Sequence, residues 1–358
     1  MNTSTIQKYY FGLYEKLKHR MIAKNVKGIA EKWTDPNFKL TPEQEQEIRA
    51  FYAPYEKIDL IFHKWNISCF GVYSPYYLPM DMYLNRVDEY FNNRAESKFL
   101  DNKCYYNSIF AGIPQPETLA CRIGGLWFSG DRQQISLAQV KTILDNEKEA
   151  FAKIAAGSCG GKGVSYLSTD NGKISAQLED FLKGVSNDII VQKPVKQHSA
   201  LAKIHESSVN TYRIISLLSE EGVKIYSAVL RIGIGGQKVD NASKGGVACG
   251  ITNDGVLKKH AFQLQGQRYD VHPTNGFVFE GYQVPSIDKA KELVKKAHVM
   301  VPHFKLVSWD VIICEDGEPL LLEANLAKGT SELHQFCNGP LFGEDTKKIL
   351  DEVFGKKQ

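Results

Sequence analysis

The first fifty residues carry apolar side chains at helical spacing. The apolar positions are Leu13, Leu17, Met21 and Ile22, and basic residues lie between them. This period predicts a helix with one apolar and one basic face. A helix lying on a membrane surface has the same pattern; we favour a packed accessory helix whose basic face is in water.

Residues 151–326 show the shorter period of strands, interrupted by tight-turn signals. The candidate strands are FAKIAA (151–156), GVSYL (163–167), KISAQ (173–177) and DIIVQKPV (188–195). The turn dipeptides between candidate strands are Asn171-Gly172, Glu221-Gly222, Asp254-Gly255 and Asp316-Gly317. Such dipeptides favour hairpins, so much of this region is expected to be antiparallel sheet. Helices are predicted over 137–152, 286–299 and 345–354.

Composition excludes several classes of protein. The 358 residues, 43% of them hydrophobic, suffice for two or three domains with sizeable cores. Lys and Arg number 44 against 41 Asp and Glu, and a net charge of +3 is too small to indicate a nucleic-acid binder. The seven cysteines are scattered without a CxxC pair, which argues against a disulfide framework and a thiolate zinc site. No apolar run is long enough for a membrane span and no signal peptide is recognised, so a cytoplasmic location is expected.

A glycine-rich segment, Gly157 to Gly163, lies between two candidate strands. Its backbone N–H groups can approach an anion closely, so it is interpreted as a hairpin that covers phosphates. It is not a P-loop, because Gly163 stands where Ser or Thr is required and a strand follows in place of a helix. Lys153, on the strand before the loop, is positioned to reach the same phosphates. A flexible turn and a solvated lysine are the alternative reading.

The strongest pattern is SWDVIICEDGEPLLLEAN (308–325), two strands around Asp316-Gly317. If these two residues form the loop, the facing pairs are Glu315 with Glu318, Ile312 with Leu321, Asp310 with Glu323, and Ser308 with Asn325. The opposite face, which carries Val311, Ile313, Leu320 and Leu322, is expected to be buried.

The facing carboxylates of Asp310 and Glu323 would repel each other unless positive charge lies between them. A divalent cation would supply that charge. Because the available ligands are hard oxygens, with Asn325 on the same face, Mg²⁺ is favoured over Zn²⁺. A solvated hairpin edge is the alternative.

Together these residues resemble the ATP-grasp superfamily, an α+β fold in which two subdomains grip ATP. Its last two core strands carry Asp and then Glu-x-Asn, which bind the magnesium ions of ATP, and Asp310, Glu323 and Asn325 match that order. The resemblance implies that ATP is bound by Lys103, Lys153, Gly160, Gly161, Lys162, Gly163, Gln192, Lys193 and Val195. It implies that Arg213 and Arg231 are catalytic together with Lys153, and that the acceptor pocket contains Asp240, Asn241, Gly245 and Gly246.

The segments SVNTYRI, RIGIGGQKVDNASKGG, SWDVII and GPLFG are similar to the sugar-transfer-associated branch, which is related to α-L-glutamate ligases. That branch implies a Mg²⁺-dependent, ADP-forming carboxylate–amine ligase that works through an acyl phosphate. It would join an amine or amino acid to a carboxylate of a sugar or peptide, in cell-surface polysaccharide or related biosynthesis. Two residues depart from the pattern: Gln192 replaces the usual Glu, and Asp240 leaves the substrate open. A phosphotransferase acting on a hydroxyl, with Asp240 as base, and a nucleotide-binding protein without catalysis remain alternatives.

The sequence patterns, taken together with the resemblance, predict four consecutive parts. They are an N-terminal helical segment (1–50), a mixed domain before the ATP-grasp core (51–135), a lid subdomain (136–196) and a C-terminal subdomain with the metal site (197–358). The oligomeric state is left open.

Overall fold

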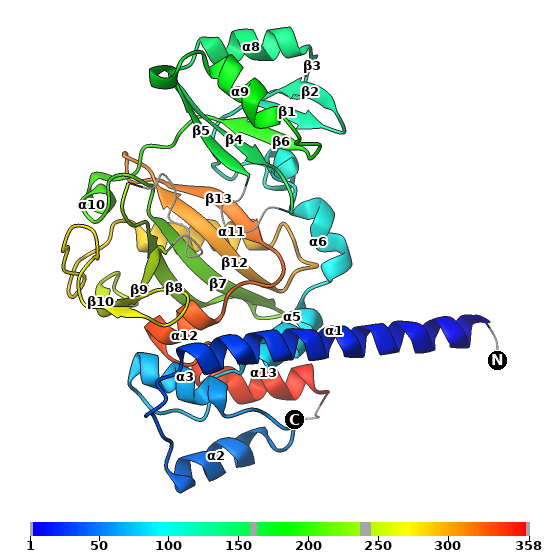
Figure 1. Cartoon of the computed structure of the whole chain (residues 1–358), viewed down its shortest axis with the longest axis vertical. Helices are drawn as coiled ribbons and strands as arrows, with labels where there is room; N and C mark the ends of the chain where they lie inside the picture. Colours follow the sequence, from blue (N-terminus) through cyan, green and yellow to red (C-terminus); the bar gives the residue numbers. More distant parts are fainter. Residues whose placement is uncertain (1–2, 158–162, 237–244, 356–358) are drawn as a thin grey trace. The chain divides into compact units, whose positions relative to one another are not determined.

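Figure 1 shows the chain as a computed structural model, which describes residues 3–157, 163–236 and 245–355. Contacts group the chain into two compact units. Unit 1 contains residues 1–91, 262–268 and 330–358, and unit 2 contains residues 92–261 and 269–329. The division into four consecutive parts remains a prediction. Among the described residues, no helix combines the length and apolar character that crossing a membrane requires.

Unit 1 is helical. Its elements are α1 (Thr3–Trp33), α2 (Pro42–Tyr52), α3 (Ile61–Phe70), α4 (Met80–Met82), η1 (Tyr83–Val87), α5 (Asp88–Phe91), α12 (Glu332–Asn338), η5 (Gly343–Asp345) and α13 (Thr346–Val353). Large aromatic side chains fill its interior, including Tyr52, Phe62, Trp65, Tyr77 and Phe336. The buried amide of Gln335 accepts from the Leu78 N–H at 2.9 Å and donates to the Leu78 carbonyl at 3.0 Å. This pairing fixes the C-terminal helices of unit 1 to the segment before α4.

The N-terminal helix is present, but the prediction of its packed face is wrong. Leu13, Leu17 and Met21 are 43%, 51% and 65% exposed, whereas Val26 and Ala30 are buried. The helix therefore packs through its C-terminal half, where it lies against α3 and α4. Small and β-branched side chains on a different face make that contact, and a periodic pattern alone does not say which of two apolar faces is covered.

Unit 2 contains two sheets. The first has the strand order β3-β2-β1-β6-β4-β5. Its strands are β1 (Thr118–Ile123), β2 (Leu126–Ser129), β3 (Gln134–Ile135), β4 (Glu149–Ile154), β5 (Val164–Ser168) and β6 (Ile189–Gln192). Helices α8 (Leu137–Asp145) and α9 (Ile174–Leu182) cover one face, as Figure 1 shows, and share a core with the sheet. Short elements of the same unit are α6 (Arg94–Leu100), η2 (Lys103–Tyr105), α7 (Tyr106–Ile109) and η3 (Thr169–Asn171).

The second sheet has the order β11-β10-β9-β8-β7-β12-β13. Its strands are β7 (Thr211–Ser219), β8 (Gly222–Ile232), β9 (Val247–Ile251), β10 (Leu257–Phe262), β11 (Arg268–Tyr269), β12 (Leu306–Ile313) and β13 (Pro319–Asn325). The amphipathic helix α11 (Ile287–His298) covers one face, and the short α10 (Ser199–Ala202) follows β6 in the chain. The pairings β7–β8, β8–β9, β7–β12 and β12–β13 are antiparallel, as expected.

Two secondary-structure predictions in the first sheet are wrong. The strand predicted over 173–177 is absent: Lys173 is the N-cap of α9 and residues 174–177 form its first turn, while Asn171-Gly172 ends η3. Ile174 and Leu178 are one helical turn apart and both buried, so the helical period determines the structure here. The helix predicted over 137–152 ends at Asp145, since Ala150 and Ala152 alternate into the sheet core as part of β4. The helices predicted over 286–299 and 345–354 are confirmed as α11 and α13.

The β12–β13 hairpin has the predicted pairing at the site, but its loop and the pairing next to the loop differ from the prediction. The Gly317 N–H donates to the Cys314 carbonyl, and Cys314 pairs with Glu318, so the loop has three residues, Glu315 to Gly317. This shifts the pairing by one and places Ile312 opposite Leu320, not Leu321. A bulge at Leu322 then cancels the shift, and Asp310 faces Glu323 as predicted.

The bulge also changes which leucine enters the core. Leu321, opposite Val311, is fully buried, whereas Leu320 and Leu322 are only half-buried. The expectation that Leu320 and Leu322 occupy the buried face is therefore wrong. The predicted pair of Ser308 with Asn325 is present.

Replacing Gly317 by alanine is expected to destabilise unit 2 by about 1–2 kcal/mol, the cost of the left-handed backbone for a residue with a Cβ. Its φ is +82°, and an added Cβ would meet only the Ser286 Oγ, at 3.7 Å, so the cost is conformational and not steric. Denaturant unfolding measures the change. Glu315→Ala, in the same loop, is the control and should change stability by less than about 0.5 kcal/mol. Equal stability of G317A and wild type would contradict this account of the turn.

Candidate functional site

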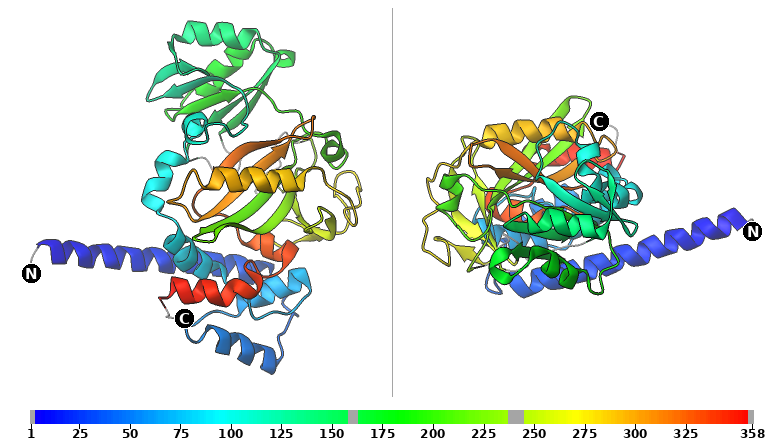
Figure 2. Two further views of the ribbon diagram at one scale, coloured as in Figure 1. Left: turned by 180° about the vertical axis from the view of Figure 1, so that it is seen from behind. Right: turned by 90° about the horizontal axis from the view of Figure 1, so that it is seen from above.

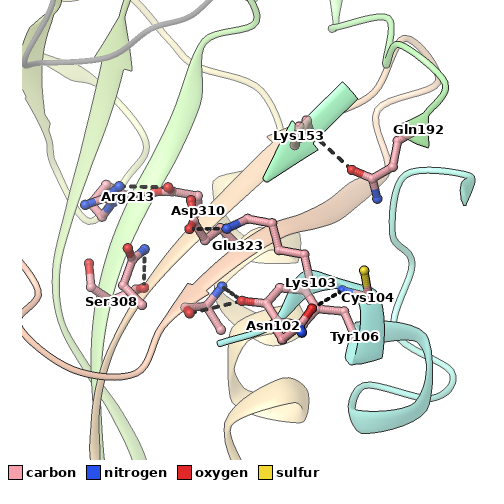
Figure 3. A network of polar contacts seen from close by, with 12 residues as sticks. Asn102, Lys103, Cys104, Tyr106, Lys153, Gln192, Arg213, Ser308, Asp310 and Glu323 are labelled. Carbon is pink, nitrogen blue, oxygen red and sulfur yellow. Dashed lines mark hydrogen bonds and ion pairs between the residues drawn. The ribbon is translucent and has the colours of Figure 1, made fainter. Parts of the chain in front are cut away.

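Asp310 lies at the centre of the candidate site, on β12 between β7 and β13. Its paired neighbours are Arg213 on β7 and Glu323 on β13. Arg213 donates to the carboxylate from Nε and from Nη2, the latter at 2.7 Å, and Arg231 donates from Nη1 at 3.0 Å. Figure 3 shows the guanidinium group of Arg213 hydrogen-bonded to the carboxylate of Asp310. Burial alone would raise the pKa of Asp310, but the two guanidinium charges outweigh it and lower that pKa.

Lys103 holds the second carboxylate. Its Nζ donates to Glu323 Oε1 at 2.7 Å (Figure 3). Burial would lower the pKa of Lys103, but the charge of Glu323 raises it above its usual value. Tyr106 joins the lysine's segment to β13, because its hydroxyl donates to the Ala324 carbonyl and accepts from the Ala324 N–H, each at 3.2 Å. Each of the two facing carboxylates is therefore compensated by basic side chains.

Oxygen atoms that could bind a metal remain at the end of β13. Among the described residues, Glu323 Oε2 and Asn325 Oδ1 accept no hydrogen bond. The Asn325 amide is oriented by its Nδ2, which donates to the Ser308 carbonyl at 3.0 Å. A set of carboxylate and amide oxygens fits Mg²⁺ better than a softer metal.

Lys153 lies on β4, in the other sheet. Its Nζ donates to Gln192 Oε1 at 3.1 Å, and Gln192 Nε2 donates to the Pro116 carbonyl at 3.4 Å. The partner of Lys153 is thus neutral. Burial and the nearby charge of Lys103 lower the pKa of Lys153 to about 8, although Glu323 partly opposes this. No sequence pattern indicates that Gln192 contacts this lysine.

The remaining predicted nucleotide residues follow β6. The Lys193 N–H donates to the Glu117 carbonyl, and its ammonium pairs with Glu117 at 3.0 Å and Glu147 at 3.2 Å. Val195 is half-buried, and none of the described residues hydrogen-bonds to its backbone. The side chain of Lys193 is therefore occupied by acidic neighbours, while the backbone at Val195 can still bind a base.

Several predicted residues lie outside the described part of the chain: Gly160, Gly161, Lys162, Asp240 and Asn241. Gly163 is described and closes the β4–β5 pairing, where its carbonyl accepts from the Ile154 N–H at 2.8 Å. Its φ is +75° and a Cβ there would overlap the Ile154 side chain, so glycine is required. Gly245 and Gly246 immediately precede β9, whose Ala248 pairs with Arg231.

Asp101 was missed by sequence reasoning. It is half-buried, and burial together with the charge of Glu323 raises its pKa to about 6, while Lys103 acts in the opposite direction. Asn102 next to it donates to Asp188 Oδ2 at 2.8 Å. Neither residue belongs to a pattern that local sequence could have singled out, because their partners are distant in the chain: Asp188 just before β6 and Glu323 on β13.

Comparison with known families decides the assignment of the fold. The model of the sugar-transfer associated ATP-grasp family matches residues 85–349, well over half of the chain. The chain belongs to this ATP-grasp family. The α+β fold and the branch expected from the sequence are therefore confirmed. The comparison with curated proteins finds no match.

Solved ATP-grasp structures are similar at low identity. D-cycloserine synthetase DcsG is 12% identical with a TM-score of 0.42, over 74% of this chain and 72% of that one. D-alanyl-alanine synthetase A from Vibrio cholerae is 16% identical with a TM-score of 0.42, over 71% of this chain and 64% of that one. D-alanine–D-alanine ligase from Bacillus anthracis is 12% identical with a TM-score of 0.41, over 74% of this chain and 69% of that one.

The affinity for ATP is expected to fall about tenfold between pH 7 and pH 9. Lys153, with a pKa near 8, is charged below that pH and largely neutral at pH 9, and a neutral amine loses its attraction for phosphate. Lys103 stays charged over this range because its pKa is raised. Isothermal titration with ATP at each pH measures the effect.

Two variants test the cause of this pH dependence. Lys153→Arg stays charged and should remove the fall in affinity. Gln192→Glu gives the lysine a charged partner, raises its pKa and should move the fall to higher pH. A wild-type affinity that is constant from pH 7 to pH 9 would show that the charge of Lys153 does not contribute to ATP binding.

Proposed function

We propose that this protein is an ATP- and Mg²⁺-dependent carboxylate–amine ligase that forms an amide through an acyl phosphate. One observation carries the proposal: Arg213, Arg231 and Lys103 converge on the facing carboxylates of Asp310 and Glu323. Such a cluster can bind a polyanion and an acceptor carboxylate side by side. The two reactants of a carboxylate activation are ATP, which is a polyanion, and the acceptor carboxylate.

The donor set supports magnesium. Asp310, Glu323 and Asn325 would hold the ion, with Glu323 Oε2 and Asn325 Oδ1 as oxygens that accept no hydrogen bond from the described residues. Bound there, the ion supplies neutralisation of phosphate charge and alignment for in-line transfer. Lys103 Nζ donates to Glu323 Oε1 at 2.7 Å and would bind phosphate oxygens beside that carboxylate.

The lysines and the lid support nucleotide binding. Lys153 is held by Gln192 and would bind phosphate oxygens together with Lys103. In this proposal Gly160, Gly161, Lys162 and Gly163 cover the phosphates and keep water from the acyl phosphate, which water would otherwise hydrolyse. The backbone at Gln192, Lys193 and Val195 would bind adenine.

The two arginines support an acidic acceptor. Asp310 binds Nε and Nη2 of Arg213, and among the described residues Nη1 has no partner. A guanidinium oriented in this way matches a carboxylate and the oxyanion of a tetrahedral intermediate. Asp310 would thus position Arg213 and Arg231 while it also faces the metal. Asp240, Asn241, Gly245 and Gly246 would line the acceptor pocket.

The acceptor in this proposal is a carboxylate of a sugar or peptide, and the nucleophile is an amine or amino acid. The sugar-transfer association of the family supports a saccharide acceptor and a role in cell-surface polysaccharide or related biosynthesis. We place the reaction in the cytoplasm, where ATP is available.

Isotope transfer tests the reaction type. Amines and uronic-acid acceptors are first screened for stimulated ADP release, and the active acceptor is then labelled with ¹⁸O in its carboxylate. Because the amine displaces phosphate from an acyl phosphate, one labelled oxygen should appear in inorganic phosphate and the product should contain a new amide. A stable phosphorylated product without an amide would establish phosphotransfer to a hydroxyl and refute the ligase proposal.

Glu323→Gln is expected to reduce Mg²⁺-dependent turnover at least about a hundredfold, because a carboxylate ligand contributes several kcal/mol to a metal-assisted transfer. ADP release over a Mg²⁺ titration measures the loss, and circular dichroism checks the fold. Glu318→Gln is the matched control, since that carboxylate lies on the same hairpin but pairs with Lys289 at the surface. Full turnover of E323Q at saturating Mg²⁺ would refute the metal assignment.

A further inference from the structure

Helix α1 carries an apolar stripe that the described residues leave exposed. The stripe consists of Leu13, Tyr14, Leu17 and Met21, which are 43%, 63%, 51% and 65% exposed. These residues lie one turn apart or adjacent, so they form one continuous face over more than two turns. Single exposed apolar residues are ordinary, but a continuous row of this kind indicates an interaction surface.

The stripe is distinct from the face through which α1 packs in unit 1. Leu17 and the buried Val26 are nine residues apart, about two and a half turns, and therefore point in opposite directions. Met21 and the buried Ala30 have the same relation. Figure 2 shows the N-terminal half of α1 continuing past the other helices of unit 1 in both views. The packing of α1 within unit 1 thus leaves the stripe available to a partner.

A row of basic residues borders the stripe. Lys16, Arg20 and Lys24 are exposed and stand three residues after Leu13, Leu17 and Met21, so each is the surface neighbour of one stripe residue. The acidic residues of the described helix pair with other lysines: Glu15 with Lys18 at 2.8 Å and Glu31 with Lys27 at 3.6 Å. Among the described residues, Lys16, Arg20 and Lys24 form no ion pair, so the face combines apolar side chains with positive charge.

We infer that α1 binds the surface of an anionic lipid membrane. Apolar side chains would enter the boundary between headgroups and acyl chains while the lysine and arginine side chains extend to lipid phosphates. A second copy of the chain fits less well, since two such faces would bring like charges together. An acidic surface complements the basic row, and each Lys or Arg near it strengthens binding about fivefold. The inference does not rest on the proposed ligase activity.

Co-sedimentation of the full chain with vesicles tests the inference. Vesicles of phosphatidylcholine mixed with phosphatidylglycerol should bind the protein, vesicles of phosphatidylcholine alone should bind it at least about tenfold more weakly, and added salt should weaken binding. The triple variants L13Q/L17Q/M21Q and K16Q/R20Q/K24Q should each lose at least about tenfold in affinity.

Matched control variants keep the test specific. V278Q/V299Q/M300Q changes three exposed apolar residues of unit 2, and K259Q/K296Q/K305Q removes three exposed lysines there. Both should bind vesicles as the wild type does, and thermal unfolding checks that all variants are folded. Failure of the folded wild type to bind anionic vesicles overturns the inference. So does equal binding by the stripe variants, and so does a dimer in sedimentation velocity that the stripe variants abolish without any vesicle binding.

Discussion

The candidate site depends on the compensation of two facing carboxylates. Asp310 and Glu323 stand opposite each other on β12 and β13, in a sheet whose other face is the core of unit 2. Arg213 and Arg231 satisfy the first carboxylate and Lys103 the second. Buried charges are tolerated when they are paired and hydrogen-bonded. The same requirement brings β7, β8 and the η2 turn to one place, so the residues that stabilise the pair are also those suited to bind anionic reactants.

The hairpin geometry keeps this arrangement in register. A three-residue loop ending at Gly317 shifts the pairing in one direction, and the bulge at Leu322 shifts it back before Glu323. A slip of one residue would turn Glu323 to the core face and Ala324 to the site face. Bulges often lie next to functional sites for this reason, since they adjust side-chain direction without changing the sheet.

Lys153 differs from Lys103 in its partner. Lys103 faces a carboxylate and stays charged, whereas Lys153 faces the amide of Gln192 and has a pKa near 8. The two lysines therefore respond differently to pH, although the charge of Lys103 acts on Lys153. A nucleotide would add negative charge beside both, which favours the charged form of Lys153 and couples its protonation to binding.

The sequence alone determined the ATP-grasp fold, the hairpin that carries Asp310 and Glu323, and the facing of these two carboxylates. These features can be recognised from local periods and turn signals, or from motifs that occur in the expected order along the chain. It could not determine that Leu321 and not Leu322 enters the core, that residues 174–177 are helical, or that Leu13, Leu17 and Met21 stay exposed. Nor could it show the pairing of Lys153 with Gln192. Each of these depends on which surface a residue meets across long sequence separations, and only tertiary packing decides that.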